Sequence, residues 1–312
     1  MSAVVEQTTP EATASDIGNS NKVETPFQRF LAGFFASKVA LGAFIVLVIL
    51  ILIAVFASLI SPTDPYDLAK VSVLDSKLPP GAESMDGVKF LLGTDGAGRD
   101  LVSAMIYGLR ISLSVGVMSG LVAMIIGAAV GLVAAYFGGR TENIIMRIVD
   151  IQLSFPAILV ALILLAVLGK GVDKIIIALI IVQWAYYART VRGSALVERN
   201  KEYIEAATCL AIGHRRILFR HMLPNCLPPL IVVGTLQTAH AISLEATLSF
   251  LGVGLPVSEP SLGLLIANGF DYMLSGKYWI SFFPGVALLV TIVAINLVGD
   301  QLRDVLNPRL ER

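Results

Sequence analysis

The sequence predicts an all-α membrane protein with six transmembrane helices, and three properties of its composition support that class. Hydrophobic residues make up 56% of the 312 residues and charged residues only 15%, and the mean hydropathy is +0.80. Soluble domains carry about 25% charged residues, so a soluble protein of this size is excluded. This hydrophobicity also excludes disorder over most of the chain. The net charge of zero argues against a nucleic-acid partner, because phosphates would find no general attraction.

The apolar residues lie in long blocks without charge, and the first block is Val39–Ile60. A helix rises about 1.5 Å per residue, so this block is about 33 Å long and can cross a hydrocarbon core of about 30 Å. The polar residues 1–21 contain no apolar region, which is unlike a signal peptide. We expect them to be a disordered tail within a cytoplasmic N-terminal segment, residues 1–38.

The second block, Ile111–Phe137, begins a core transmembrane domain that covers residues 111–306. Small residues spaced four apart let the backbones of two helices approach closely. The block carries two such small-xxx-small pairs, Gly116 with Gly120 and Gly127 with Gly131. This spacing predicts close helix packing along one face.

An external segment, residues 61–110, precedes this block and ends in an amphipathic stretch that begins at Leu101. Asp95 and Asp100 lack the alternating acidic spacing of a calcium loop. We therefore expect the carboxylates to cap the amphipathic helix at its N-terminus. Arg99 and Arg110 are expected to anchor that helix at the outer membrane interface.

Three more blocks cover residues 148–168, which contain Pro156, residues 227–248 and residues 280–299. The remaining block, the fourth in order, is Ile175–Ala188, and it is short for a membrane span. Its flanking Lys and Arg side chains are therefore expected to snorkel toward the membrane surface. Three aromatic residues are expected to form an interfacial belt there, namely Trp184, Tyr186 and Tyr187.

The distribution of Lys and Arg predicts that both termini are cytoplasmic. With that orientation, 15 of the 23 basic residues lie inside, and the external segment contains seven acidic and five basic residues. Residues 189–222 then form a large cytoplasmic loop, with a coupling region at about 193–222. Residues 307–312 form a cytoplasmic C-terminus.

Motifs for catalysis or metal binding are absent from the sequence. There is no phosphate-cradling G-x-x-x-x-G-K-[ST] loop, no H-E-x-x-H and no C-x-x-C. Two cysteines, Cys209 and Cys226, are too few for a disulfide framework, and both are expected to be buried free thiols. We expect no cofactor in this chain and a role in transport rather than catalysis.

The cytoplasmic loop has the spacing of two amphipathic helices. Gly213 separates the two sets of apolar residues, and Pro224 is expected to end the second helix. The two sets are Ile204, Ala207 and Ala211, then Ile217, Leu218 and Met222. The spacing alone favours an ordinary positively charged cytoplasmic loop over a special role.

The residues of this loop resemble a known motif. Glu205-Ala206-Ala207, followed by Ile217 and by His221-Met-Leu-Pro-Asn225, is similar to the EAA loop of ABC-importer permeases. Further stretches resemble permeases of dipeptide and oligopeptide uptake, most closely the second, C-type permease. They are Leu92–Asp100, Ile106–Leu113, Met146–Asp150 with Phe155-Pro156, Leu248–Gly252, Pro284-Gly285 and Asn296–Arg309.

The resemblance implies a type I ABC-importer (MetI-like) fold in a bacterial inner membrane. It implies four kinds of partner: a homologous second permease, two cytoplasmic ATPase subunits that bind ATP and Mg, a periplasmic or extracellular substrate-binding protein, and the lipid bilayer. It also implies that the loop docks on an ATPase. The coupling residues it implies are Tyr203, Glu205, Ala206, Ala207, Ala211, Gly213, Arg215 and Arg216.

The sequence departs from the family in two places. The family usually has glycine six residues after the glutamate, where this chain has Ala211, and Gly213 follows two residues later. The turn between the helices can therefore be shifted. Toward the C-terminus, Asn307 and Leu262 stand where the family usually has aspartate and tryptophan. Leu262 falls in an external part of the chain, so a difference in substrate handling stays open.

Three polar residues fall within predicted spans. Asp150 is one helical turn from Arg147, so we expect an ion pair between them. Glu245 has no basic residue three or four positions away, and a role in gating or in the translocation path is as open as a structural hydrogen bond. Asn296 is expected to join helices, with a place on the path as the alternative.

Two alternatives to peptide import stay open. Permeases for nickel, glutathione, opines or sugars resemble this family and would share its motifs. An ion-coupled secondary transporter would show matching halves and broken helices at the membrane midplane. No matching halves are present in the sequence.

Overall fold

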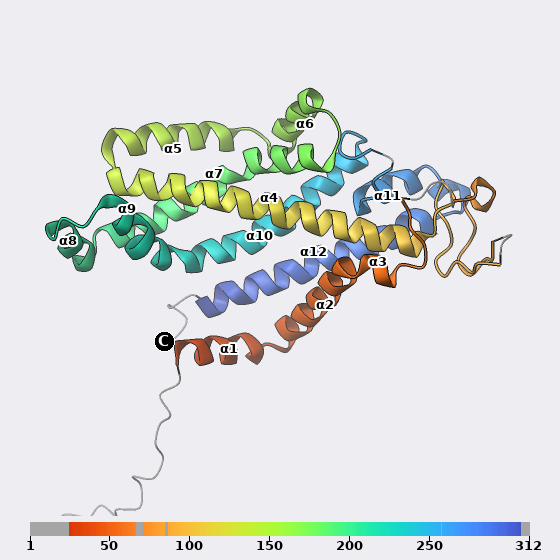
Figure 1. Ribbon diagram of the computed structural model, residues 1–312, viewed down its shortest axis with the longest axis horizontal. Helices are drawn as coiled ribbons and strands as arrows, with labels where there is room; N and C mark the ends of the chain where they lie inside the picture. The colour runs from red at the N-terminus through yellow and green to blue at the C-terminus, as the bar shows by residue number, and fades with distance from the viewer. Residues whose placement is uncertain (1–24, 67–70, 85–86, 257, 307–312) are drawn as a thin grey trace, which may run out of the picture.

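The computed structural model describes residues 25–66, 71–84, 87–256 and 258–306. The predicted tail over residues 1–21 and the C-terminal residues 307–312 lie outside the described residues. Within the described chain, five helical segments are long and apolar enough to cross a membrane, and a bent pair of helices passes the same test together, which gives up to six crossings. Long helices run roughly along the molecule's long axis (Figure 1). They are α2 (Lys38–Val55), α4 (Leu101–Phe137), α7 (Val172–Arg199), α10 (Leu223–Phe250) and α12 (Trp279–Leu306).

The third crossing is broken, whereas the sequence predicts one block over residues 148–168. Helix α5 (Gly139–Ser154) and helix α6 (Ala157–Leu168) meet at an angle of 89°. The residue before a proline is pushed toward extended backbone, and Phe155 has φ −91° and ψ 141° directly before Pro156. Proline therefore ends the first helix, and the chain turns before the second begins.

Helix α4 is longer than predicted because the amphipathic stretch and the second span form a single helix of 37 residues. The amphipathic stretch at the end of the predicted external segment therefore continues without a break into the second span. The predicted N-cap is confirmed for Asp100, whose carboxylate accepts the Ser103 backbone N–H at 2.8 Å. Gly138, with φ +65°, ends the helix.

Helix α7 spans 28 residues and continues to Arg199. The charged residues that bound the apolar block, Lys174 and Arg189, therefore lie within the helix. Whether their side chains snorkel toward the membrane surface stays a prediction. The predicted aromatic belt is wrong for Tyr187, which has no exposed surface and belongs to the core.

The glycine pairs of α4 explain how closely this helix packs against α7 and α10. A Cβ on Gly127 would lie 2.4 Å from the carbonyl oxygen of Trp184, and a Cβ on Gly131 would lie 2.5 Å from that of Ala188. These two glycines therefore place α4 directly against the backbone of α7. Gly116 lies close to α10, where a Cβ would lie 2.5 Å from the Ile242 side chain and 3.3 Å from the Thr238 carbonyl oxygen. The close packing predicted from the spacing is confirmed.

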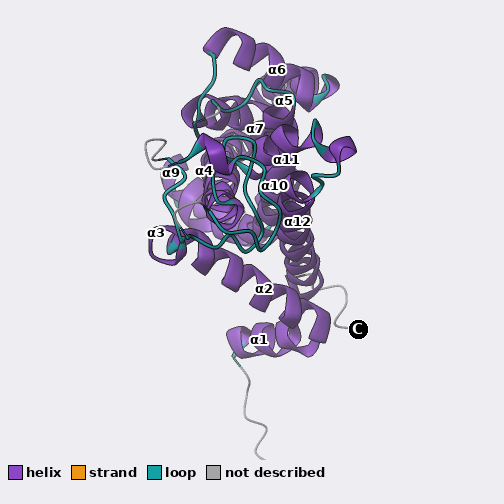
Figure 2. Ribbon diagram, turned by 90° about the vertical axis from the view of Figure 1, so that its right-hand side faces the viewer, coloured by secondary structure: helices purple, strands orange, loops and turns teal. Residues whose placement is uncertain are grey.

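The first helices lie at the edge of the bundle (Figure 2). Helix α1 (Pro26–Ala36) opens with a capping box at Thr25, and α2 leads into the short α3 (Ala57–Ile60). Phe34 and Ala43 pack with Val298 of α12. Most of the remaining α2 side chains are exposed and apolar, as expected of a helix in contact with lipid or with another protein.

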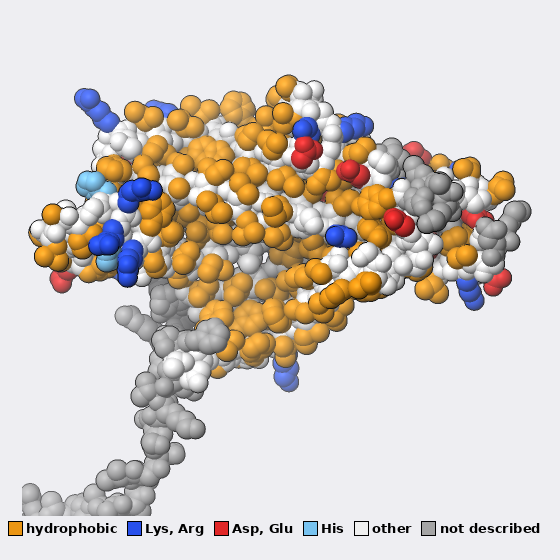
Figure 3. All heavy atoms as spheres, in the orientation of Figure 1, with side chains coloured by type: hydrophobic (Ala, Val, Ile, Leu, Met, Phe, Trp, Pro, Cys, Tyr) orange, Lys and Arg blue, Asp and Glu red, His pale blue; other side chains and the backbone are white. Residues whose placement is uncertain are grey.

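The two ends of the molecule differ from its middle. Hydrophobic side chains dominate the middle, whereas charged side chains gather at both ends (Figure 3). One end carries α8 (Glu202–Cys209) and α9 (His214–Arg216), and α1 and the end of α12 lie on the same side (Figure 1). The opposite end carries α11 (Leu262–Phe270) and most of the loops (Figure 2). Two short 3₁₀ turns lie in these loops, η1 (Val73–Asp75) and η3 (Met273–Ser275).

Candidate coupling site

The predicted helix–turn–helix is present at the end that carries α8 and α9. Helix α9 continues into a π-helical turn, η2 (Ile217–Met222), which runs directly into α10. The expectation that Pro224 ends the second helix is wrong, because the chain remains helical from His214 to Phe250. Pro224 lies just after the π-helical turn, at the second position of α10.

One face of this module is buried against the bundle. Ile204 and Ala207 of α8 belong to the same core cluster as Leu132 of α4 and Ala195 of α7. Ile217, Leu218 and Met222 complete the inner face. The apolar spacing therefore predicted the buried positions, except at Ala211, which is exposed in the turn.

The turn lies at Ala211 and is not shifted toward Gly213. Ala211 has φ +53°, and its N–H donates to the Thr208 carbonyl at 3.0 Å, while the Ile212 N–H donates to the Ala207 carbonyl at 3.1 Å. This pair of bonds is a Schellman motif, whose left-handed position is usually glycine. Gly213 has φ −58°, which any residue can adopt.

The outer face of the module carries most of the residues that the resemblance implies for coupling. Glu205 and Ala206 of α8 are exposed, as are Arg215 and Arg216 of α9. Leu210 is 76% exposed between the two helices. Cys209 is exposed as well, which corrects the expectation of two buried thiols. Its position at the end of α8 turns it away from the core, while Cys226 is buried as expected.

A polar cluster joins the module to the spans. The Tyr203 hydroxyl donates to Glu198 Oε2 at 2.5 Å and accepts from Asn225 Nδ2 at 2.8 Å. Lys201 forms an ion pair with the other oxygen of Glu198. Partial burial and the neighbouring Glu198 carboxylate hold the pKa of Tyr203 above its usual value, so the phenol stays protonated and able to donate.

Glu198 and Asn225 were missed as site residues by the sequence reasoning. Glu198 is three residues before Lys201, which is a helical ion-pair spacing, and that was the available signal. Asn225 is separated from Tyr203 by 22 residues, so only the fold brings them together.

Helix α9 is also fastened to the end of α4. His214 Nδ1 and the Tyr136 hydroxyl are 2.7 Å apart. Nearby, Arg199 of α7 donates to the Ala135 carbonyl at 3.0 Å. The module is therefore attached to α4, α7 and α10 at once.

Glu245 lies in α10, far along the chain from this module, and has no exposed surface. Its carboxylate accepts the Ser112 hydroxyl of α4 at 2.9 Å and the Ser249 hydroxyl at 2.7 Å. Ser261, which caps α11, also hydrogen-bonds to it. In this conformation the carboxylate joins three helices. Whether it also acts in gating or the path stays a prediction.

Asn296 is half-buried on α12 and makes no side-chain hydrogen bond with another described residue. Asp150 pairs with Arg189 of α7, not with Arg147 as expected. Helix α5 packs beside α7, so a partner across the helix interface replaces the one on the same helix.

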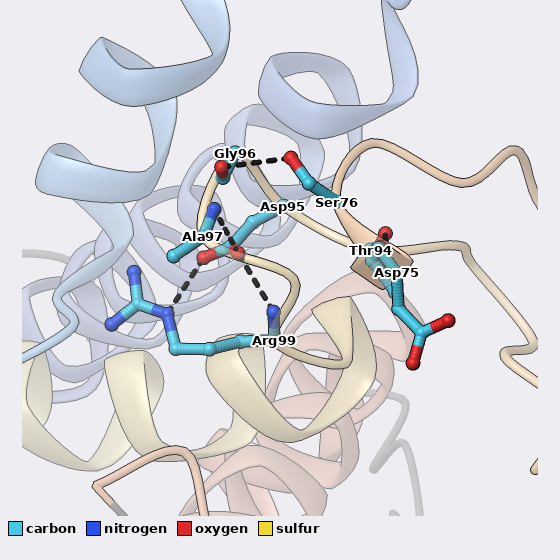
Figure 4. A network of polar contacts seen from close by, with 7 residues as sticks. All are labelled: Asp75, Ser76, Thr94, Asp95, Gly96, Ala97 and Arg99. Carbon is cyan, nitrogen blue, oxygen red and sulfur yellow. Dashed lines mark hydrogen bonds and ion pairs between the residues drawn. The ribbon is translucent and has the colours of Figure 1, made fainter. Parts of the chain in front are cut away.

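At the opposite end, the external segment is held by a compact polar network (Figure 4). Asp95 Oδ1 accepts the N–H groups of Ala97 and Arg99, both at 2.9 Å, and its Oδ2 pairs with Arg99 Nε at 2.7 Å. Arg99 is only 2% exposed, so the expectation that it anchors the helix at the membrane interface is wrong. Asp95 shapes the turn before α4 and does not cap it.

Six crossings with a helical module between the fourth and fifth define a permease of the type I ABC-importer fold. Two inward-facing crystal forms of the MetNI methionine ABC transporter share it. One has a TM-score of 0.53 at 21% identity and covers 65% of this chain and 96% of that chain. The other has a TM-score of 0.53 at 22% identity and covers 66% and 98%.

The chain belongs to the family described as binding-protein-dependent transport system inner membrane component, whose profile matches residues 127–312. Residues 25–80 also match the N-terminal TM domain of oligopeptide transport permease C. The chain is thus a multi-pass permease component of an ABC importer. This membership leaves the alternative of an ion-coupled secondary transporter without support.

Relatives of similar length are named as peptide permeases. The di/tripeptide transport system permease protein DppC of Pseudomonas aeruginosa is 37% identical over 92% of this chain and 93% of that protein. A putative peptide transport system permease of Brucella suis is 41% identical over 84% and 86%. The dipeptide transport system permease DppC of Escherichia coli is 39% identical over 92% and 95%.

Proposed function

We propose that this chain is a non-catalytic subunit of a bacterial importer for short peptides. A homologous second permease supplies the other half of the translocation path. Two ATPase subunits bind ATP and Mg and dock at the α8–α9 end. A substrate-binding protein delivers the peptide to the opposite end. The names of the relatives as di/tripeptide, dipeptide and oligopeptide permeases support the choice of substrate.

The observation that carries the docking proposal is the division of the α8–α9 module into two faces. Ile204 and Ala207 hold it to the bundle, while Glu205, Ala206 and Arg215 face outward. The small side chain of Ala206 allows a partner to approach closely. The Glu205 carboxylate can pair with a basic partner residue, which sets specificity more than affinity.

The same end of the molecule is proposed to be cytoplasmic. Arg215, Arg216 and Arg220 gather there and are exposed, in line with the excess of basic residues on the cytoplasmic side of membrane proteins. The described chain starts and ends on that side (Figure 1), which supports the proposal that both termini are cytoplasmic in a cell whose inner membrane holds the protein.

Reversing the charge of Glu205 tests the docking proposal. In Glu205→Lys, a positive charge faces the basic partner residue, and such a like-charge contact costs several kcal/mol. We expect uptake of a labelled dipeptide, measured in a strain lacking the native permease, to fall at least about tenfold. The amount of permease in the membrane should stay unchanged.

The matched control is Asp271→Lys, a charge reversal at an exposed position at the other end of the molecule. It should leave docking of the ATPase intact. Normal uptake by Glu205→Lys would contradict the docking proposal. Uptake of nickel, glutathione, opines or sugars in place of the dipeptide would contradict the peptide assignment alone.

A further inference from the structure

One tyrosine hydroxyl connects three helices at the coupling end. Tyr203 lies in the first turn of α8, Glu198 in the last turn of α7, and Asn225 in the first turn of α10. The hydroxyl donates to Glu198 and accepts from Asn225 at 2.5 Å and 2.8 Å. Glu198 is only 7% exposed although it carries a charge, so its carboxylate depends on these partners.

These hydrogen bonds differ in kind from the other contacts of α8. Ile204 and Ala207 hold the helix through apolar packing, which is non-directional and permits sliding or rotation. A hydrogen bond depends steeply on distance and angle. The Tyr203 hydroxyl therefore fixes the position of α8 relative to α7 and α10, whereas the apolar face only keeps it attached.

The joint also reaches the one π-helical turn in the described chain. The His221 carbonyl of η2 accepts from Asn225 Nδ2 at 3.1 Å, and the same amide nitrogen donates to the Tyr203 hydroxyl. π-helical turns are rare and often lie at functional sites. A displacement of Tyr203 thus acts on the segment through which α9 passes into α10.

We infer that Glu198, Tyr203 and Asn225 form a positioning joint that passes movements of α8 to α7 and α10. The inference rests on the proposed docking of the ATPase at the α8–α9 end. It assigns Glu198 and Asn225 a part in transport, and it separates two tasks within the module. Glu205 and its exposed neighbours hold the ATPase, while the joint relays its motion to the spans.

The test is Tyr203→Phe in the complete importer, reconstituted in liposomes with its second permease, ATPases and binding protein. Phenylalanine keeps the ring and removes the hydroxyl that bridges Glu198 and Asn225. We expect the ATPase subunits to co-purify in unchanged amounts and ATP hydrolysis to stay within about twofold. The amount of labelled dipeptide transported per ATP should fall about tenfold, because a charged hydrogen bond and a neutral one are both lost.

Two further variants complete the experiment. Tyr278→Phe removes an exposed hydroxyl at the opposite end and should behave as wild type. Asn225→Ala opens the joint from the α10 side and should also lower transport per ATP. Since both variants act on one network, Tyr203→Phe combined with Asn225→Ala should cost less than the sum of the two.

The outcomes distinguish a role of Tyr203 in relaying motion from a role in docking the ATPase. Loss of the ATPase from Tyr203→Phe would overturn the inference, because Tyr203 would then be a docking contact. Unchanged transport per ATP in both Tyr203→Phe and Asn225→Ala would overturn it as well. Failure of the docking proposal would appear instead as ATPase binding that persists in Glu205→Lys.

Discussion

The turn of the coupling module requires an unfavourable backbone conformation at one residue, Ala211. Residues with a Cβ are disfavoured in the left-handed region by about 1–2 kcal/mol, and Ala211 has φ +53°. The Schellman bonds from Ala211 and Ile212 hold the turn in place despite that cost. Nearby Gly213 adopts φ −58°, a backbone conformation that does not require glycine.

A pair of substitutions follows from this difference. Ala211→Gly should stabilise the protein by about 1 kcal/mol, because it relieves the left-handed strain and only part of the gain is lost to a more flexible unfolded chain. Gly213→Ala should be neutral or slightly stabilising, since a Cβ there meets nothing within 4 Å. Thermal unfolding of the purified protein in detergent measures both. A lower midpoint for Ala211→Gly would contradict the assigned turn.

A second feature at the scale of single residues is the buried carboxylate of Glu245, which accepts hydrogen bonds from serine hydroxyls. Unpaired charges in the membrane interior are expensive, and three serine hydroxyls surround this one. They come from α4, α10 and the cap of α11, so the contact positions α11 against the bundle. This arrangement supports the structural alternative of the two that the sequence leaves open.

At the scale of elements, the contact between α4 and α7 organises the bundle. Gly127 and Gly131 allow the α7 backbone to approach so closely that a Cβ would lie 2.4 or 2.5 Å from a carbonyl oxygen. Lipid tails are as apolar as the helix surfaces, so membrane helices associate largely through such close packing.

We therefore expect Gly127→Ala to destabilise the protein by about 1–3 kcal/mol, the range for overpacked cores. The added methyl group has backbone atoms of Trp184 and Ala188 as neighbours, and backbone cannot rotate away. Gly42→Ala in α2 is the control, because a Cβ there meets nothing within 4 Å. The readout is the unfolding midpoint in detergent. Equal midpoints for the two variants would contradict the close packing.

At the scale of the whole molecule, alternating crossings place the coupling module and both ends of the described chain on one side (Figure 1). The loops and α11 lie on the other side. Cys209 is exposed at the coupling end and Cys226 is buried. A single reactive thiol can therefore report the orientation of the whole protein.

A membrane-impermeant maleimide should label Cys209 in inside-out vesicles and leave it unlabelled in right-side-out spheroplasts. Vesicles without the ATPase subunits keep the proposed docking surface uncovered. Cys209→Ser should abolish labelling, because Cys226 is buried. In that background Val73→Cys, at a position 78% exposed in the external segment, should label from the outside. Labelling of Cys209 in spheroplasts would reverse the proposed orientation.

The composition and spacing of the sequence determined several features by themselves. Long uncharged blocks indicated a membrane protein because charge is expensive in lipid. The spacing of Gly116 and Gly127 with their partners predicted helix contacts, and Asp100 predicted the start of a helix. The periodicity around Ile204 and Ile217 predicted which face of the coupling module is buried. Each of these features depends on neighbours within about one helical turn.

Only the tertiary structure decided the features that depend on contacts distant in sequence. Pro156 broke the third crossing by an angle that no periodicity encodes. Asp150 pairs with Arg189 across a helix interface, and the fold brings Tyr203 to Asn225 across a separation of 22 residues. A sequence pattern specifies the face that a residue occupies, but the residue opposite it is set by how the helices pack.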